Sequence, residues 1–381
     1  MRVVIAPDSF KGSMTSADVC EAINVGLHKY KSSISVHSMP IADGGEGTVD
    51  AIVRVMGGDK IYEEVNDPLG RKISSAYGWV PDSKTAIIET AAASGLPRLM
   101  CNELNPLKAS TIGTGELIKF ALDRGAERII LGLGGSATVD AGAGCFQALG
   151  VKFYNSIGEE LNMNGKALSQ VADIDATTFR QISDGVEWII ASDVSNPLLG
   201  ERGAVHVFGP QKGVTSSQLK IFERGMENYA NVMKNYTNKE VMDNRGSGAA
   251  GGFGFSLFSL IEDYYVESGF DLIASLGNLE KQIKEANLVI TGEGRVDSQT
   301  LYGKGPIGVA RLAKKHGVPC IAFAGVIEGE LSGAKDEGML VIFPIVNRPM
   351  TLDEAIARGP QLLQEAAQRF MEVYNLNHKD V

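Results

Sequence analysis

The chain opens with two short apolar runs, at residues 2–6 and 34–39, and each is followed by a segment in which apolar residues recur every three or four positions. The runs have the length of buried strands, and the spacing after them is typical of amphipathic helices. Because parallel strands need a crossover helix between them, two such units in succession predict a parallel sheet. Further runs of the same kind lie near the other end of the chain, at residues 288–290, 320–324 and 340–344.

The pattern between these two ends is mixed. Residues 73–80 and 85–89 are predicted to be antiparallel strands, because a Pro-Asp turn separates them. Apolar runs at residues 128–131 and 188–191 predict further buried strands, and residues 204–208 predict another, which ends at a Gly-Pro pair. The middle of the chain therefore belongs to a different kind of sheet from its ends.

We predict an α/β protein with two domains. A Rossmann-like parallel-sheet α/β/α domain is expected from residues 1–66 and 286–381, and an inserted mixed α/β domain from residues 67–285. A chain of 381 residues has the usual length for two domains. Insertion of one domain into another also explains why the predicted strands at the two chain ends are of the same kind, short apolar runs typical of a parallel sheet. The active site is expected in the cleft between the domains.

Composition narrows the possible functions. The formal net charge is −10, and the basic residues form no stripe, which argues against a nucleic-acid partner. No apolar stretch approaches the ~18 residues of a membrane span, and the N-terminus lacks the pattern of an export signal. The four cysteines show neither a disulfide pattern nor zinc-ligand spacing. We expect a cytoplasmic monomer or homodimer that acts on small molecules and binds neither membrane nor nucleic acid.

Glycine is abundant, at 45 residues, and much of it stands in loops that follow predicted strands. Five loops after predicted strands are candidates. Four of them share one order, an apolar strand, then glycine with acidic or basic side chains, then a helix or turn, and the fifth, at residues 192–197, carries Asp193 without a glycine. The five loops lie at residues 8–13, 43–47, 132–140, 192–197 and 291–297. Backbone N–H groups and helix N-termini in loops of this kind bind phosphate. We expect distant parts of the chain to meet around one anion, near residues 10, 45, 193 and 295.

The last of these loops is densely charged. Glu293, Arg295 and Asp297 place two carboxylates and a guanidinium within five residues. Charges packed that closely at the end of a buried strand need a ligand, a metal or a partner to offset their desolvation. We expect the strand to stop at Thr291 and the glycines at positions 292 and 294 to turn the backbone.

The common motifs of other enzyme classes are absent from the sequence. It has no P-loop and no Gly-x-Ser-x-Gly elbow. Gly132-x-Gly134-x-x-Ala137 matches a dinucleotide-binding fingerprint, but the next predicted strand ends at Asn155, where that fold has an acidic residue. We interpret this turn as a general anion-binding site. The histidines are scattered and indicate no catalytic triad; they are His28, His37, His206, His316 and His378.

The remaining candidates are carboxylates, cations and glycine turns, which together favour phosphoryl transfer. That reaction needs an acid to orient or deprotonate the acceptor hydroxyl, carboxylates for Mg²⁺, and cations for the transferring group. The candidate catalytic residues are Lys11, Asp43, Asp193, Arg295 and Asp297, and the candidate metal ligands are Glu46 and Glu293. The candidate substrate- and phosphate-binding residues are Ser9, Ser13, Gly44, Gly45, Gly134, Gly135, Ser136, Gly292 and Gly294.

Most of these side chains also have a structural interpretation. Asp43 and Glu46 fit the first turn of the helix that follows them, since acidic residues favour helix N-termini. Asp193 fits a polar turn, and Lys11 fits a solvated loop position. Outside the candidate set, Asp140 is expected to cap a helix rather than to bind a metal.

Four of the loops together resemble the bacterial glycerate kinases of the type that includes the glyoxylate- and glucarate-pathway enzymes. The resemblance extends over nearly the whole chain and rests on residues 6–13, 42–48, 132–138 and 291–300. It implies ATP-dependent phosphorylation of D-glycerate with Mg²⁺, in a cleft between two α/β domains. It also implies 2-phosphoglycerate as the usual product of this type. Ala141 is a departure, since the family often has glycine there.

Two other classes of function stay open on the sequence alone. The fingerprint at Gly132 also fits an NAD(P)-dependent oxidoreductase of a hydroxy acid. A non-catalytic two-domain protein that binds a small acid would carry similar loops, without a response to nucleotide.

Overall fold

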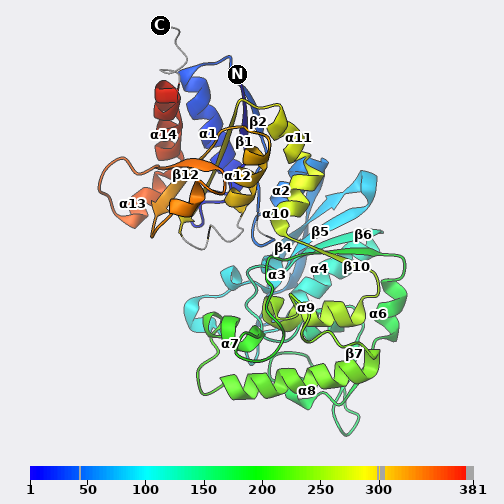
Figure 1. Ribbon diagram of the computed structural model, residues 1–381. Helices are drawn as coiled ribbons and strands as arrows, with labels where there is room; N and C mark the ends of the chain where they lie inside the picture. Colours follow the sequence, from blue (N-terminus) through cyan, green and yellow to red (C-terminus); the bar gives the residue numbers. More distant parts are fainter. Residues whose placement is uncertain (43, 298–299, 301–304, 375–381) are drawn as a thin grey trace. The chain divides into compact units, whose positions relative to one another are not determined.

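The computed structural model describes residues 1–42, 44–297, 300 and 305–374 (Figure 1). It confirms the α/β class that the sequence predicts. No helix in these ranges combines the length and the apolarity needed to cross a bilayer. The chain divides into two compact units: unit 1, residues 1–43, 50–56 and 270–381, and unit 2, residues 44–49 and 57–269.

Unit 1 contains a five-stranded parallel sheet. Its strands are β1 Arg2–Ile5, β2 Ser35–Ser38, β11 Leu288–Val296, β12 Cys320–Ile327 and β13 Met339–Pro344. They lie in the order β13-β12-β11-β1-β2, and Val3 pairs with Leu288 at the centre. The central strands β1, β11 and β12 are nearly continuous in apolar residues, as strands covered on both faces usually are. The sheet is therefore the core layer of unit 1.

Helices cover both faces of this sheet. α1 (Ser16–Tyr30) and α14 (Gly359–Tyr374) lie side by side on one face (Figure 1), where Ile23 and Leu363 join a buried cluster with Ile5. α12 (Gly305–Lys315) packs against β11 and β12. Right-handed crossovers place α1 and α12 on opposite faces, because the chain moves in opposite directions along the sheet. Within the described ranges, the other α-helices of unit 1 are α10 Gly269–Leu276, α11 Leu279–Lys284, α13 Leu352–Ala357 and the larger part of α2 Thr48–Met56.

Unit 2 contains a six-stranded mixed sheet. Its strands are β3 Asp59–Asn66, β4 Lys72–Val80, β5 Thr85–Glu89, β6 Arg128–Gly132, β9 Glu187–Ala191 and β10 Tyr264–Glu267. The order is β10-β9-β6-β5-β4-β3, with antiparallel pairs β3–β4 and β4–β5 and parallel pairs elsewhere. The antiparallel pair predicted around the Pro-Asp turn is confirmed. A separate two-stranded sheet joins β7 Lys152–Tyr154 and β8 Asp173–Asp175.

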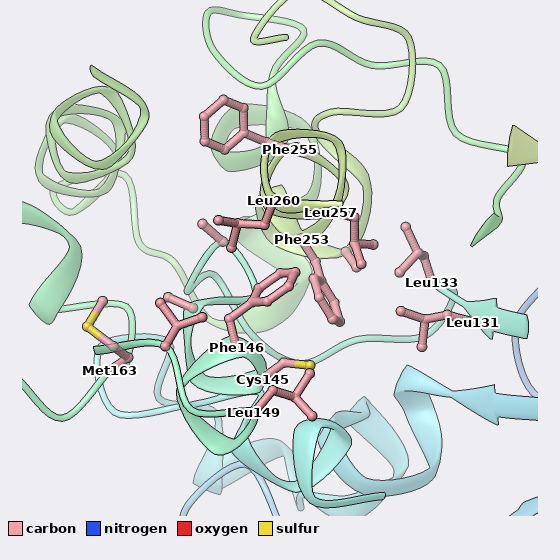
Figure 2. Packing of buried hydrophobic residues seen from close by; sticks show 14 of the residues in the cluster. Leu131, Leu133, Cys145, Phe146, Leu149, Met163, Phe253, Phe255, Leu257 and Leu260 are labelled. Carbon is pink, nitrogen blue, oxygen red and sulfur yellow. The ribbon is translucent and has the colours of Figure 1, made fainter. Parts of the chain in front are cut away.

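The core of unit 2 is rich in aromatic side chains. Figure 2 shows Phe146 of α5 (Ala143–Ala148) beside Phe253 of α9 (Ala249–Leu260), and their rings meet edge to face with centroids 6.2 Å apart. Leu131 of β6 belongs to the same cluster. Edge-to-face contact is a favoured geometry of aromatic pairs. The cluster thus holds the first turns of α5 and α9 near the end of β6. The other helices are α3 Thr90–Ser94, α4 Ile112–Asp123, α6 Thr177–Ile182, α7 Ala204–Phe208 and α8 Leu219–Thr237.

Residues 204–208 form the helix α7 and not the predicted strand. Val207 N–H donates to the Gly203 carbonyl at 3.1 Å, which is the helical pattern. A five-residue apolar run fits a strand and a buried helical turn equally well. Ala204 and Val205 are adjacent and both buried, so burial does not alternate as it would in a half-exposed strand. The position beside β9 that a further strand could take is held by β10.

β11 is longer than predicted and does not stop at Thr291. It continues to Val296, and neither Gly292 nor Gly294 has a positive φ. The reason is pairing with β12, where Gly292 lies beside Phe323. A Cβ atom on Gly292 would lie 2.3 Å from the Phe323 carbonyl oxygen, so glycine permits the close approach of two backbones. The predicted turn at these glycines is therefore wrong, and the charges that follow stand on an extended strand.

Replacement of Gly292 by alanine is expected to lower the free energy of unfolding by about 1–3 kcal/mol, because overpacking this contact displaces one of the two strands. Gly225 of α8 offers a matched control, since a Cβ atom there would meet no atom closer than 3.5 Å. Gly225→Ala should raise the free energy of unfolding by about 0.5–1 kcal/mol, because alanine favours the helix. Urea denaturation of both variants measures the contrast. Wild-type stability of Gly292→Ala would contradict the close pairing of β11 and β12.

Candidate functional site

The two central strands of unit 1 mark the point where the order of the strands reverses. From β1 the chain passes to β2 on one side, and from β11 it passes to β12 on the other. In open α/β sheets, ligands bind outside the carboxyl ends of the strands at such a point. A cavity of about 770 Å³ is lined there by the loop after β1 and by the end of β11. A hydrogen bond of 2.8 Å from Asp8 N–H to the Gly292 carbonyl joins the two segments.

The polar side of this cavity holds many of the predicted site residues. Ser13 Oγ donates to the Ile356 carbonyl at 2.8 Å, so its hydroxyl hydrogen ties the loop to α13. Gly292 contributes its carbonyl group behind the cavity, as the acceptor for Asp8 N–H. The predicted residues that the structure brings together around the cavity are Ser9, Lys11, Ser13, Glu293, Gly294, Arg295 and Asp297.

The two cations of the cavity differ in their surroundings. Arg295 forms ion pairs with Asp297, at 3.5 Å between Nε and Oδ2, and with Glu328. Lys11 is exposed and forms no ion pair with any residue that the structure describes. Two carboxylates therefore neutralise Arg295, whereas the ammonium group of Lys11 can face an anionic ligand.

Buried carboxylates line the same side of the cavity. Asp8 and Glu293 are each 8% exposed. Asp8 accepts a hydrogen bond from Ser9 N–H at 2.6 Å, and Glu293 accepts one from the Thr300 hydroxyl at 2.7 Å. Within the described ranges, no three Asp, Glu, His or Cys side chains form a ready-made metal site. Mg²⁺ commonly binds through one or two protein carboxylates together with substrate phosphates, so Asp8 and Glu293 fit it.

Another part of the cavity lining is apolar. It is formed by the segment between β13 and α13 and by α13 itself, with Ile345, Val346, Met350, Leu352 and Ile356. An apolar wall that faces a few polar groups is the usual composition of a pocket for an organic ligand. Neither this wall nor Asp8 is among the residues predicted from the sequence, because apolar loop residues carry no motif and Asp8 lies at the very start of its loop.

In unit 2, the segment 44–49 lies at the carboxyl ends of the parallel strands. Gly134 N–H donates to the Gly44 carbonyl at 3.2 Å, and a Cβ atom on Gly134 would lie 2.5 Å from Gly45 Cα. Val49 N–H donates to the carboxylate of Glu89 at 2.7 Å, at the end of β5. The structure therefore brings the predicted residues Gly44, Gly45 and Gly134 together, just before α2 (Thr48–Met56) begins.

Three predicted acidic residues belong to this region. Asp43 precedes the segment in the sequence, Glu46 lies within it, and Asp193 follows β9 at the same end of the sheet. Glu46 is exposed, and Asp43 lies outside the described residues. Asp193 is exposed directly after β9. A Cβ atom on Gly44 would lie 3.0 Å from the Ala191 carbonyl oxygen, so the segment approaches the strand that leads to Asp193.

The turn after β6 contains the other predicted residues. Gly135 has a φ of +72° and is exposed, whereas Ser136 is buried. Lys212 Nζ donates to Ser136 Oγ at 2.6 Å and to the Thr138 carbonyl at 2.8 Å. Burial lowers the pKa of Lys212 to about 7, and the nearby carboxylate of Asp140 acts in the opposite direction. Lys212 is not among the residues predicted from the sequence, because it stands in a polar Gly-Pro-Gln-Lys-Gly turn without a known motif.

The glycine turn that matches the dinucleotide fingerprint, residues 132–137, is not followed directly by a helix. After Gly132 the chain runs through an irregular segment, and α5 begins only at Ala143. In dinucleotide-binding folds, a helix starts at the glycines and its N-terminus holds the pyrophosphate. The geometry therefore disfavours the NAD(P)-linked interpretation.

Asp140 is fully buried and has the structural role that the sequence predicts. Its carboxylate accepts hydrogen bonds from Thr111 N–H at 2.7 Å, Thr111 Oγ1 at 2.8 Å, Gly142 N–H at 3.2 Å and Gly144 N–H at 3.3 Å. Thr111 and Gly142 are the N-cap residues of α4 and α5, and Gly144 lies in the first turn of α5, so one carboxylate accepts hydrogen bonds at the N-termini of both helices. The next residue, Ala141, has a φ of +54°, a left-handed conformation that glycine adopts more easily.

Comparisons with known proteins agree with the sequence resemblance. Residues 3–375 match the family model for the glycerate kinase family. The glycerate kinase of Halalkalibacterium halodurans is 42% identical, over 98% of both chains. The glycerate 2-kinase of Escherichia coli is 41% identical, over 93% of both chains. A crystal structure from Salmonella typhimurium, assigned as glycerate kinase 2, superposes with a TM-score of 0.88 over 100% of both chains, at 37% identity.

Proposed function

This chain belongs to the glycerate kinase family, and on that premise we propose that it transfers the γ-phosphate of ATP to a hydroxyl group of D-glycerate. We propose 2-phosphoglycerate as the product, because a relative with 41% identity is named glycerate 2-kinase. The structural observation that carries the proposal is the cavity at the switch point of unit 1. It combines the Lys11 ammonium group, buried carboxylates and an apolar wall, which suit a phosphorylated organic ligand.

Most of the predicted residues have a proposed role in the reaction, whereas Ser13 and Gly292 hold the backbone of the site through their hydrogen bonds to Ile356 and Asp8. Lys11 stabilises the charge on the transferring phosphoryl group, which is the main requirement of phosphoryl transfer. Asp297 orients the acceptor hydroxyl and accepts its proton, with Asp43 and Asp193 as the alternative bases. Arg295 positions Asp297 through their ion pair. The turns that contain Ser9, Gly44, Gly45, Gly134, Gly135, Ser136 and Gly294 are proposed to bind the phosphate oxygens.

Mg²⁺ is proposed to enter with the phosphates of ATP. When bound, it neutralises part of the phosphate charge and polarises the transferring group. Glu293 and Asp8 would hold it, since both are buried carboxylates that line the cavity. Glu46 is kept as a proposed additional ligand from unit 2.

We propose that the predicted residues of both units act on the same reactants. We therefore propose that they do so in a cleft between the two predicted domains, residues 1–66 with 286–381 and residues 67–285. Substitutions in either group of residues should then lower turnover without a comparable loss of stability.

The purified protein should consume ATP only when D-glycerate and a divalent cation are both present. Removal of the cation with EDTA should abolish turnover, because the phosphate charge is then uncompensated, and Mg²⁺ should restore it. A coupled ADP assay measures the rate, with glycerol as the control acceptor that lacks a carboxylate. Phosphorus NMR of the product separates 2-phosphoglycerate from 3-phosphoglycerate. ATP consumption that ignores glycerate would contradict the proposal.

A further inference from the structure

Lys212 is only 2% exposed, which is unusual for lysine because burial removes the hydration of the ammonium group. Two of its three N–H donors are used, by Ser136 Oγ at 2.6 Å and by the Thr138 carbonyl at 2.8 Å. A methionine would fill a similar volume without the desolvation penalty. Packing alone therefore does not account for a lysine at this position.

The hydrogen bond from Lys212 determines how Ser136 can be used. An ammonium group only donates, so Ser136 Oγ accepts from it and the hydroxyl hydrogen of Ser136 points elsewhere. No acceptor for that hydrogen is present in the part of the chain that the structure describes. Ser136 stands next to the exposed Gly135, in a turn that follows the carboxyl end of a parallel strand. The hydroxyl is thus a polarised donor that lacks an acceptor, and a phosphate oxygen would supply one.

We propose that Lys212 is the positioning residue of a phosphate-binding turn formed by residues 134–136, in which it directs the Ser136 hydroxyl toward a phosphate oxygen of the bound nucleotide or product. The inference rests on the proposed kinase function and adds to it a residue from a distant part of the sequence. The charge of Lys212 acts on the ligand through Ser136 and not by direct contact.

The backbone behind Lys212 is held in an uncommon conformation that leaves room for the ammonium group. Ala250, Gly251 and Gly252 have consecutive φ angles of +51°, +70° and +91°. A Cβ atom on Gly251 would lie 2.1 Å from the Thr138 carbonyl oxygen and 3.1 Å from Lys212 Nζ. Left-handed alanine is unfavourable, and such residues persist where the surrounding structure requires them, often at functional sites.

The protonation state of Lys212 should appear in the pH dependence of kcat/KM. A purely structural role of Lys212 would leave that pH dependence unchanged. Burial lowers its pKa to about 7, and Asp140 is the charged residue that acts on it in the described part of the chain. Only the protonated form fixes the Ser136 hydroxyl as a donor to the ligand. In the free enzyme, function should therefore fall as the pH rises through the pKa of Lys212. A bound phosphate stabilises the ammonium group and raises that pKa in the complex.

The test compares full-length wild type with Lys212→Met, Lys212→Arg, Ser136→Ala and the Lys212→Met/Ser136→Ala double variant. In the wild type, kcat/KM for ATP should fall as the pH rises through neutrality, while kcat should fall only at higher pH. Lys212→Met should lower kcat/KM roughly 10- to 100-fold and remove the descending limb. Lys212→Arg should recover part of the loss and stay active at high pH, since arginine keeps its charge.

The double variant shows whether the two residues act as one unit. Ser136→Ala should remove the same descending limb, and the addition of Lys212→Met should lower kcat/KM little further. A wild-type kcat/KM in folded Lys212→Met, or additive losses in the double variant, would overturn the inference. If thermal unfolding shows that Lys212→Met does not fold, Ser136→Ala decides: an unchanged kcat/KM and pH profile overturn the inference, and the loss of both supports it.

Calorimetric binding of inorganic tripolyphosphate separates this inference from the kinase proposal. A wild-type protein without glycerate-dependent ATP consumption would defeat the kinase proposal alone. Weaker tripolyphosphate binding by both Lys212→Met and Ser136→Ala than by the wild type would still support the phosphate-binding turn. Equal affinity in all three proteins, or no binding by the wild type, would overturn it.

Discussion

Asp297→Asn should lower kcat for glycerate phosphorylation by about 10²- to 10⁴-fold, the usual range for loss of a general base, and change the free energy of unfolding little. Asparagine keeps a side-chain oxygen for the Thr300 N–H group, which donates to Asp297 at 3.3 Å. It cannot accept a proton from the acceptor hydroxyl, and it loses the ion pair with Arg295. Steady-state kinetics and urea denaturation of the same preparation separate the two effects.

Glu337→Gln is the control for the loss of a carboxylate near the surface of unit 1. Glu337 pairs with Arg311 and does not line the cavity, so the variant should keep wild-type turnover. Asp193→Asn tests the alternative base in unit 2, and it should also lose rate far more than stability. A wild-type kcat in Asp297→Asn would show that Asp297 is not the base. A large loss of kcat in Asp193→Asn, with no loss in Asp297→Asn, would identify Asp193 as the base.

Asp140→Ala should lower the free energy of unfolding by about 3 kcal/mol or more, because it leaves several buried N–H and O–H donors without an acceptor. Four hydrogen bonds converge on this carboxylate from Thr111, Gly142 and Gly144. Chemical denaturation measures the loss. Asp175→Ala is a matched control, since Asp175 accepts a hydrogen bond from Thr177 N–H at 2.9 Å outside the main core, and its loss should lower stability far less than the loss of Asp140.

The same carboxylate should leave a signature in the dependence of stability on pH. Burial raises the pKa of Asp140, although its hydrogen bonds lower it in part. A pKa that is higher in the folded state than in the unfolded state means that the folded protein holds the proton more tightly. The contribution of Asp140 is then greatest below the unfolded-state pKa and falls as the pH rises through the folded-state pKa. Asp140→Asn should remove this dependence; an identical pH profile of stability in the variant would contradict the assignment.

The sequence predicts the parallel strands of unit 1 well because β1, β11 and β12 are buried on both faces and read as apolar runs. It does not predict β3 and β10, whose side chains are largely exposed and therefore polar in part. The predicted end of β11 at Thr291 is wrong for a different reason. Gly292 and Gly294 usually indicate a turn, but here they lie in an extended strand. The backbone of β12 passes close to Gly292, and the loop after β1 passes close to Gly294.

Part of the site can be predicted because glycine and charge stand together in a loop after a strand, as at Lys11 and Gly12 after β1, or among the last residues of a strand, as at Glu293 of β11. Lys212 cannot be found in this way. It lies 76 residues from Ser136 in the sequence, and its burial arises only when the turn after β6 and the first residues of α9 come together. The apolar wall of the cavity is hidden for a similar reason, since Met350 and Leu352 resemble ordinary loop and helix residues until the fold places them around a hollow.

The segment 44–49 belongs to unit 2, although residues 50–56 return to unit 1. A recombinant fragment that started at residue 57 would therefore lack a piece of its own structure. Glu89 would lose the N–H group of Val49, and Gly134 would lose its acceptor on Gly44. A recombinant unit 2 with its native structure has to carry residues 44–49 on an artificial linker or bind them as a short synthetic peptide added in trans. Binding of that peptide would show that the end of the sheet is intact.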